Sequence, residues 1–113
     1  MERVIRVAMD FSDTPGARFR SQGDFSGEEF RERILIPAVL EAKKNGEKII
    51  IDLDGTYGYP PSFLEEAFGG LVRAYPAEDF SQIFEFITFD EPELKERIAN
   101  YIKNGNADSK ARR

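Results

Sequence analysis

An apolar run in the middle of the chain constrains the fold more than any other feature. Residues 48–53, Lys-Ile-Ile-Ile-Asp-Leu, are rich in β-branched side chains and are followed directly by the turn signal Asp54-Gly55. Such a run is typical of a central strand that is buried on both faces. Because segments with helical spacing stand before and after it, the run favours an α/β fold in which mostly parallel strands alternate with helices.

Two further segments are predicted to be strands, and a third is a candidate. Residues 5–11 alternate between apolar and polar side chains, and residues 83–89 are dense in Phe and Ile. The short stretch 18–20, Arg-Phe-Arg, can add one more strand. The apolar face of the first strand is predicted to consist of Ile5, Val7, Met9 and Phe11.

Three helices are predicted between and after these strands. Capping boxes at Ser26 and Ser62 indicate two helix starts, and Asp90 indicates the third. The first helix should end at Asn45-Gly46 and bend or break at Pro37, since proline removes one hydrogen bond inside a helix. We expect a single domain over residues 1–104 and a disordered tail over residues 105–113.

The composition excludes several kinds of chemistry. The 113 residues contain no cysteine and no histidine, so disulfides, Cys- or His-based metal sites, thiolate nucleophiles and imidazole bases are absent. We expect no metal and no cofactor.

Charge and hydropathy limit the partners. The chain has 16 basic and 21 acidic residues, and three of the basic ones but only one acidic one lie in the tail, which leaves residues 1–104 at −7. This acidic body excludes direct nucleic-acid binding through a broad basic face. No apolar stretch approaches ~18 residues, so we expect no membrane span and a cytoplasmic protein.

The segment 49–56, Ile-Ile-Ile-Asp-Leu-Asp-Gly-Thr, resembles the first motif of haloacid-dehalogenase-type phosphatases. The resemblance implies that Asp52 is a nucleophile, that Asp54 is a general acid/base and that magnesium bridges the two. Side chains two apart on a strand share a face, as this chemistry requires. The alternative is structural, with both carboxylates ending the strand and shaping the turn.

A second resemblance extends over nearly the whole chain. The order of elements resembles the STAS fold of anti-sigma-factor antagonists, and several strings resemble a bacterial STAS-like domain family of unknown function. These strings are Gly16–Phe19, Ser26–Arg31, Ile34–Pro37 and Ser62–Leu71. The resemblance implies an α/β, STAS-like fold with about four strands in a mostly parallel, mixed sheet and helices mainly on one face.

The resemblance also implies a function in regulation and signalling. It indicates a non-enzymatic module that binds a protein partner, such as a histidine-kinase-type ATPase domain, as a monomer or weak homodimer. In anti-sigma antagonists a serine at the start of the helix after the central strand is phosphorylated, and Ser62 is the nearest match. Pro60-Pro61-Ser62-Phe63 departs from the family's Asp-Ser-Ser-Gly, so a helix cap is the alternative role of Ser62.

Further candidate contact residues surround Ser62. Tyr57, Tyr59 and Phe63 are predicted to be an exposed aromatic patch for a partner, or a local cluster over the end of the sheet. Glu65 and Glu66 lie in the first helical turn, where the helix dipole alone explains them. Arg18 and Arg20 are candidates for an anion contact, with solvated loop charges as the alternative.

Overall fold

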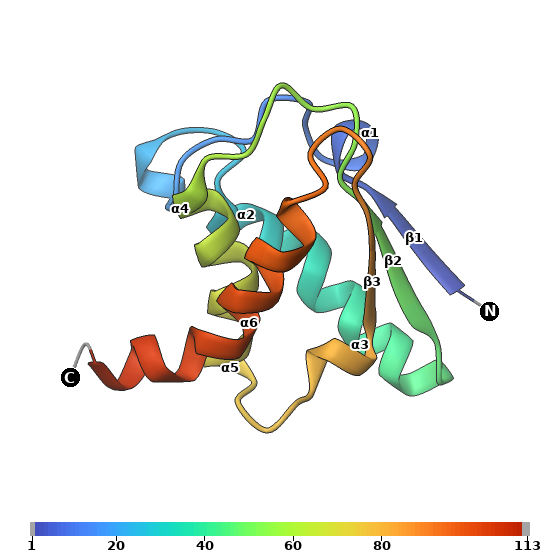
Figure 1. Ribbon diagram of the computed structural model, residues 1–113. Coiled ribbons are helices and arrows are strands. Elements are labelled where there is room, and N and C mark those ends of the chain that lie inside the picture. The colour runs from blue at the N-terminus through green and yellow to red at the C-terminus, as the bar shows by residue number, and fades with distance from the viewer. Residues whose placement is uncertain (1, 112–113) are drawn as a thin grey trace.

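The computed structural model describes residues 2–111 and has a three-stranded parallel sheet with helices packed against it (Figure 1). The strands pair in the order β1-β2-β3, with β2 in the centre. They are β1 (Glu2–Arg6), β2 (Lys48–Asp52) and β3 (Phe84–Ile87). The α/β class and the parallel arrangement are confirmed. The described residues contain three strands, which corrects the expected four.

Helical segments connect the strands. A short turn, α1, follows β1; the chain then passes through two long helical runs separated by β2 and ends in α6. The segments in chain order are α1 (Val7–Asp10), η1 (Arg20–Gln22), α2 (Gly27–Phe30), η2 (Arg31–Leu35), α3 (Ile36–Asn45), α4 (Pro61–Leu64), η3 (Glu65–Gly69), α5 (Gly70–Ala74), η4 (Phe80–Gln82) and α6 (Leu94–Ala111).

The first strand is shorter than the alternating pattern predicts. β1 ends at Arg6, level with the end of β2 at Asp52, and the chain turns at once into α1. The Asp10 carboxylate accepts the Arg6 N–H at 2.8 Å, which stabilises this turn. Val7 is therefore buried, whereas Met9, expected on the same face, is exposed.

The segment 18–20, expected as an additional strand, leads instead into the 3-10 turn η1. Its backbone is engaged with the start of the first helical run: the Arg18 carbonyl accepts the Glu28 N–H at 3.0 Å, and the Arg20 N–H donates to the Glu28 carboxylate at 2.9 Å. These bonds replace the pairing that a strand would need, so the prediction of a strand here was wrong.

The first helical run begins and ends as predicted. The Ser26 hydroxyl accepts the Glu29 N–H at 3.0 Å, and Gly46 adopts a left-handed conformation with φ of 66°. The expected break at Pro37 takes the form of a π-helical turn, η2, which immediately precedes α3. Proline cannot donate the backbone hydrogen bond of an α-helical turn, and the helix widens into a π turn just before it.

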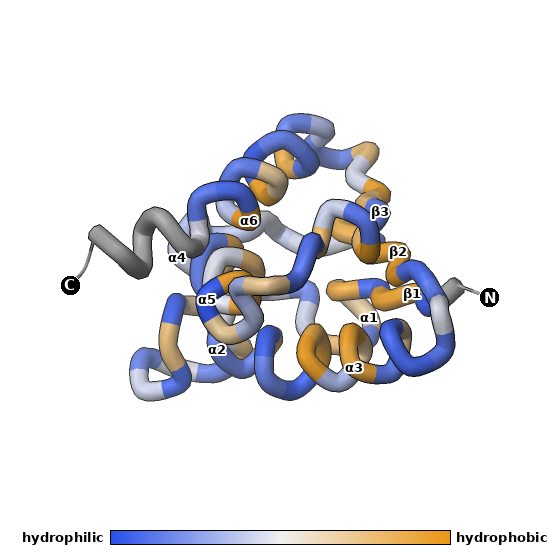
Figure 2. Tube along the Cα trace, turned by 90° about the horizontal axis from the view of Figure 1, so that it is seen from below, coloured by the Kyte–Doolittle hydropathy of each residue, from blue (hydrophilic) through white to orange (hydrophobic). Residues whose placement is uncertain are grey.

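The helices cover one face of the sheet. Viewed from below, the strands lie to one side of the helices (Figure 2). Ile49 and Ile51 of β2 are fully buried beneath the helices, but Ile50 is half-buried and its neighbour Val4 is exposed. The central strand is thus buried on one face, not on both as predicted. The resemblance to the STAS fold implied this arrangement, with the helices mainly on one face of the sheet.

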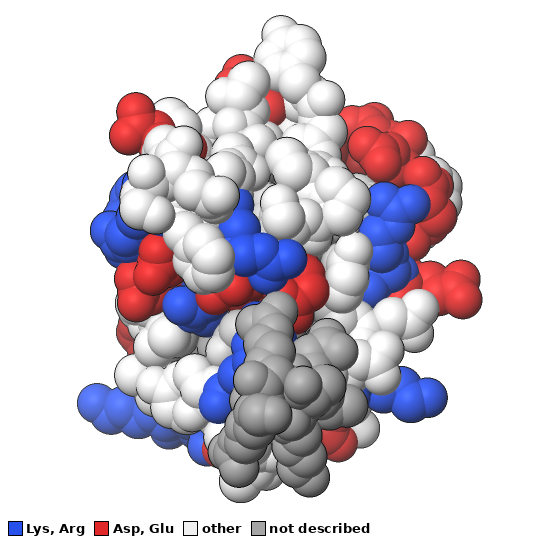
Figure 3. Space-filling model, turned by 90° about the vertical axis from the view of Figure 1, so that its left-hand side faces the viewer, with Lys and Arg blue, Asp and Glu red and all other residues white. Residues whose placement is uncertain are grey.

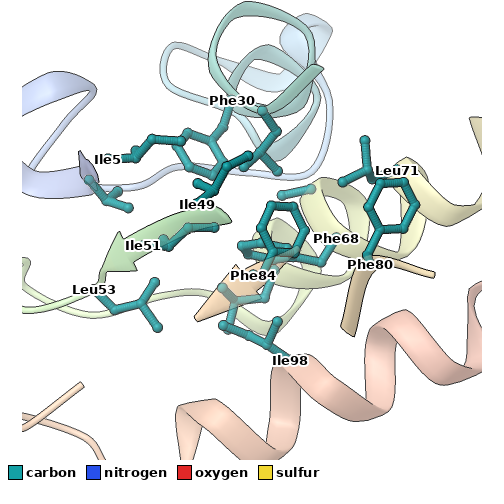
Figure 4. Packing of buried hydrophobic residues seen from close by; sticks show 14 of the residues in the cluster. Ile5, Phe30, Ile49, Ile51, Leu53, Phe68, Leu71, Phe80, Phe84 and Ile98 are labelled. Carbon is teal, nitrogen blue, oxygen red and sulfur yellow. The ribbon is translucent and has the colours of Figure 1, made fainter. Parts of the chain in front are cut away.

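Phenylalanine side chains dominate the core between the sheet and the helices (Figure 4). Phe68 packs edge-to-face on Phe84 and Phe86 of β3, with ring centroids 6.0 and 5.7 Å apart. Phe30 links this group to the first helical run. α6 contributes the buried Ile98 and runs to Ala111, so the helix extends well past the expected end at residue 104. Residues 112–113 of the predicted tail lie outside the described residues.

Candidate functional site

Three large apolar side chains are exposed at the carboxyl end of the sheet. Met9 lies in α1 after β1, Tyr57 in the loop after β2, and Phe89 in the loop after β3. Their exposed fractions are 80%, 86% and 84%. In parallel sheets the loops at the carboxyl ends of strands are the usual place for binding sites. We call these three side chains the carboxyl-end surface.

The three loops are joined to one another around Gly55. Ala8 of α1 lies against Gly55, at 3.4 Å from the position that a Cβ atom would occupy there. The Gly55 N–H donates to the Asp90 carboxylate at 3.0 Å, and the Tyr57 N–H donates to the Asp13 carbonyl at 2.8 Å. The carboxyl-end surface is therefore presented by loops that hold each other in place.

Asp52 and Asp54 hold the backbone of these loops. The Asp52 carboxylate accepts the Asp54 N–H at 3.0 Å. The Asp54 carboxylate accepts the N–H groups of Phe89 and Asp90 at 3.1 and 2.9 Å. This is the geometry expected for the structural alternative. Within the described residues no three acidic side chains converge as a metal site would require.

The predicted aromatic patch is only partly exposed. Tyr57 is exposed, but Tyr59 and Phe63 are buried, which corrects the expected exposure of both and fits the alternative of a local aromatic cluster. The Tyr59 hydroxyl donates to the Leu53 carbonyl at 2.8 Å, and burial raises the pKa of this hydroxyl. Phe63 packs between Phe30 and Tyr59 in the core. The burial of Phe63 was missed because the helix begins at Pro61, which turns Phe63 inward.

Ser62 does not cap the helix as predicted. The helix begins at Pro61, two residues earlier than a cap at Ser62 requires, and Pro60 occupies the capping position without a side-chain hydrogen bond. Ser62 is half-buried and lies in the first turn of α4, which continues through η3 and α5 to Ala74. Its hydroxyl has no hydrogen-bond partner among the described residues, so it is available to solvent or to another molecule at the N-terminal end of this helical run.

Glu65 and Glu66 are the centre of a network of ion pairs below Ser62. Glu65 contacts Arg18 at 2.5 Å and Arg73 at 2.6 Å. Glu66 contacts Arg31 at 2.6 Å and Arg18 at 3.2 Å. Both glutamates are buried, so these contacts are screened less than surface pairs. Figure 3 shows acidic and basic atoms in contact across the middle of one face of the protein, with mostly uncharged atoms above them.

The network shifts the acidity of its members. Burial opposes ionisation of Glu65, but the hydrogen bonds and charges of Arg73 and Arg18 outweigh it and hold the pKa of Glu65 below its ordinary value. Burial likewise lowers the pKa of Arg18, and the bonds to Glu65 and Glu66 outweigh it, so the pKa of Arg18 is raised. Both groups therefore remain charged at neutral pH.

The glycine pair Gly69-Gly70 makes room for this network. A Cβ atom on Gly69 would collide with the Glu65 carboxylate, and one on Gly70 would collide with the Arg31 guanidinium. These two glycines therefore pack against charged side chains. Gly105 allows a different close approach, of α6 to the second helical run, because a Cβ atom there would lie 2.8 Å from the Gly69 carbonyl.

Arg18 and Arg20 do not form a shared anion site. The anions that Arg18 contacts belong to the chain itself, Glu65 and Glu66, while Arg20 pairs with Glu32 at 3.1 Å. Glu65 and Glu66 likewise have inward partners, which removes them from the set of surface contacts expected around Ser62.

The sequence signals were weak for the other residues of the ion-pair network and of the carboxyl-end surface. Arg31 and Arg73 lie in helices where an exposed charge is the ordinary interpretation. Met9 and Phe89 were assigned to the apolar faces of strands. A turn signal, Asp90-Glu91-Pro92, directly follows Phe89 and indicates that the strand has already ended there.

Comparison with known proteins gives one match. Residues 26–94 match the sequence model of a family described as a STAS-like domain of unknown function. The matched segment contains η3, β2 and Ser62, but not β1 or most of α6. No curated protein and no solved structure matches the chain significantly. Within the described residues, no helix is both long enough and apolar enough to cross a bilayer.

Proposed function

Because the chain belongs to the family of STAS-like domains of unknown function, we propose that it is a non-enzymatic regulatory module that binds a partner protein. The contact region consists of the carboxyl-end surface and of Ser62, at the start of the helical run that follows the loop of Tyr57. Binding at this end and its control by modification of Ser62 follow the partner-switching scheme of anti-sigma antagonists, which the sequence resembles. The partner that this scheme suggests is a histidine-kinase-type ATPase domain.

The observation that carries the proposal is the exposure of Met9, Tyr57 and Phe89 on joined loops. Large exposed apolar side chains that cluster at one end of a domain are typical of a protein interface. Loops that are already held in place lose little conformational freedom on binding, which favours affinity.

Ser62 gives this interface a switch. Its hydroxyl lies in the first turn of the helical run 61–74 and has no internal hydrogen-bond partner within the described structure. A phosphate at this position is stabilised by the dipole of the helical run that begins at Pro61. The same added charge weakens the binding of a partner that fits the neutral hydroxyl.

The contact region is tested by capture of partners from the source organism with the purified chain. The variant Met9→Ser/Tyr57→Ser/Phe89→Ser should lose the partner that the unmodified chain retains. Leu40→Ser is the matched control, since Leu40 is 53% exposed but lies on α3. Equal capture by the triple variant and the unmodified chain contradicts the proposal.

The switch is tested separately with the captured partner. Mass spectrometry should find phosphate on Ser62 after incubation with that partner and ATP. Ser62→Glu should weaken binding measured by calorimetry, whereas Ser62→Ala should bind like the unmodified chain. If Ser62→Glu binds equally well, the regulatory role of Ser62 is excluded while the contact region stands on its own test.

A further inference from the structure

A cavity of about 500 Å³ lies between α6, the segment that leads into β3, and β3 itself. One wall is α6, and the other is the segment 76–81 that leads into β3 (Figure 1). Its volume is in the range of about 300–1,000 Å³ that is typical of small-molecule sites. None of its lining residues belongs to the contact region proposed above.

The floor of the cavity is apolar and aromatic. Phe80 and Phe84 stack with their ring planes 13° apart, and Phe86 adjoins Phe84 with ring centroids at 5.9 Å. Val72 and Ile102 complete the apolar lining. Phe80 and Phe84 come from adjacent elements in Figure 4 and point toward the same region of the core. An apolar molecule placed here exchanges water contacts for ring contacts, which is favourable.

Two lysines on α6 supply positive charge at the cavity. Lys95 and Lys103 are eight residues apart on one helix face, with Ala99 between them, and thus lie roughly 12 Å apart along the axis. Neither lysine has an ion-pair partner in the described part of the chain, whose ion pairs involve other basic residues.

The acidic residues at the cavity are already engaged. Glu78 pairs with Lys43, and the Asp79 carboxylate accepts the backbone N–H and the hydroxyl of Ser81. The four charged residues that line the cavity, Glu78, Asp79, Lys95 and Lys103, have no net charge. Because Glu78 is paired with Lys43, the charged groups at the cavity that have no ion-pair partner within the described residues include both lysines.

We infer that this cavity is a binding site for a small amphipathic carboxylate. The apolar body of the ligand lies on the rings of Phe80, Phe84 and Phe86. Its carboxylate is bound by Lys95 or Lys103, as each is an ammonium group without another partner. The site is independent of the proposed protein contact region and of Ser62.

Decanoate, used below its micelle-forming concentration, is the probe. Calorimetry on the full chain should give saturable binding of one decanoate per chain. Decanol and decylamine, which share its apolar body, should bind about tenfold more weakly, equivalent to roughly 1.4 kcal/mol. Decanol binding as tightly as decanoate would overturn the assignment of an anionic ligand, and absence of saturable decanoate binding would overturn the site.

Two variants locate the ligand. Lys95→Gln/Lys103→Gln should weaken decanoate binding about tenfold, and Lys44→Gln, an exposed lysine on α3, is the matched control that should leave it unchanged. Ala99→Trp should abolish binding by filling the cavity, and since Ala99 is exposed the variant should fold. Circular dichroism checks folding. Unchanged decanoate affinity in the folded Ala99→Trp variant would place the ligand elsewhere and overturn the proposal.

Discussion

The Asp54 carboxylate is bonded to the backbone of Asp90 across the carboxyl end of the sheet. The Asp54 carboxylate accepts the Asp90 N–H at 2.9 Å, and the Asp90 carboxylate accepts the N–H of Gly55, the residue after Asp54, at 3.0 Å. The loops that follow β2 and β3 are thereby tied together. Asp54, one of the two aspartates in the phosphatase-like string 49–56, therefore organises the loops on which the proposed contact region depends.

We predict that Asp54→Ala lowers the free energy of unfolding by about 1 kcal/mol, because the exposed backbone N–H groups of Phe89 and Asp90 exchange a charged acceptor for water. Urea unfolding followed by circular dichroism measures the change. Asp13→Ala is the control, since the Asp13 side chain is exposed and only its backbone carbonyl is bonded. An equal effect of both substitutions would contradict the role of Asp54.

Gly70→Ala should destabilise the protein, although alanine favours an ordinary helix position over glycine by about 1 kcal/mol. The added methyl group would displace the Arg31 guanidinium and disturb its contacts with Glu66. We expect a loss of about 1–3 kcal/mol, as for overpacking elsewhere. Thermal unfolding gives the sign directly, and a stabilised variant would mean that Arg31 moves aside without cost.

Acid should weaken the fold partly through Glu65. The folded pKa of Glu65 is below its ordinary value of ~4.3. The stabilisation it contributes is therefore complete above the ordinary pKa and is lost as the pH falls through the folded pKa. Glu65→Gln should show a flatter loss of stability between roughly pH 5 and pH 2. Urea unfolding at a series of pH values measures this, and Glu96→Gln, which changes an exposed and unpaired carboxylate, should retain the steeper profile.

We predict that the purified chain has no magnesium-dependent phosphatase activity. Asp52 and Asp54 are occupied by backbone N–H groups of the loops. Hydrolysis of p-nitrophenyl phosphate with and without magnesium is the assay. Activity that requires magnesium and disappears in Asp52→Asn would show that the chain is an enzyme and would refute the non-enzymatic proposal.

Local signals were sufficient for much of the fold. The run 48–53 identified the central strand, Ser26 the start of the first helical run, and Gly46 its end. Each of these rests on a few neighbouring residues. Pro37 correctly indicated an interruption, although the form it takes, a π-helical turn, depends on packing that the sequence pattern does not contain.

The incorrect predictions concern segments whose conformation is set by a competing hydrogen bond or by contacts with residues that are distant in sequence. The alternation over residues 5–11 continues past Arg6, but β2 ends at the same level and Asp10 stabilises a turn. Met9 and Phe89 are exposed because they lie beyond the ends of β1 and β3. Residues 18–20 bond to the first helical run and so do not join the sheet.

The position of the candidate site could be predicted from the sequence, but not all of the residues that form it. The loop after β2 and the start of the next helix were expected to form it, and Tyr57 and Ser62 are accessible there. Glu65 and Glu66 were expected to need no partner beyond the helix dipole. Their partners Arg18, Arg31 and Arg73 are up to 48 residues away in sequence, a relationship that no local pattern contains.

The π-helical turns η2 and η3 have a consequence for how related sequences can be aligned. A π turn accommodates one residue more than an α-helical turn, so a one-residue gap within either turn leaves a continuous helix. Deleting that residue converts the wide turn into an α-helical one and leaves the downstream residues on the same face of the helix. In the second run Leu71 and Val72 would then still face the core. Each run can therefore lose one residue at its π turn without moving the buried side chains that follow.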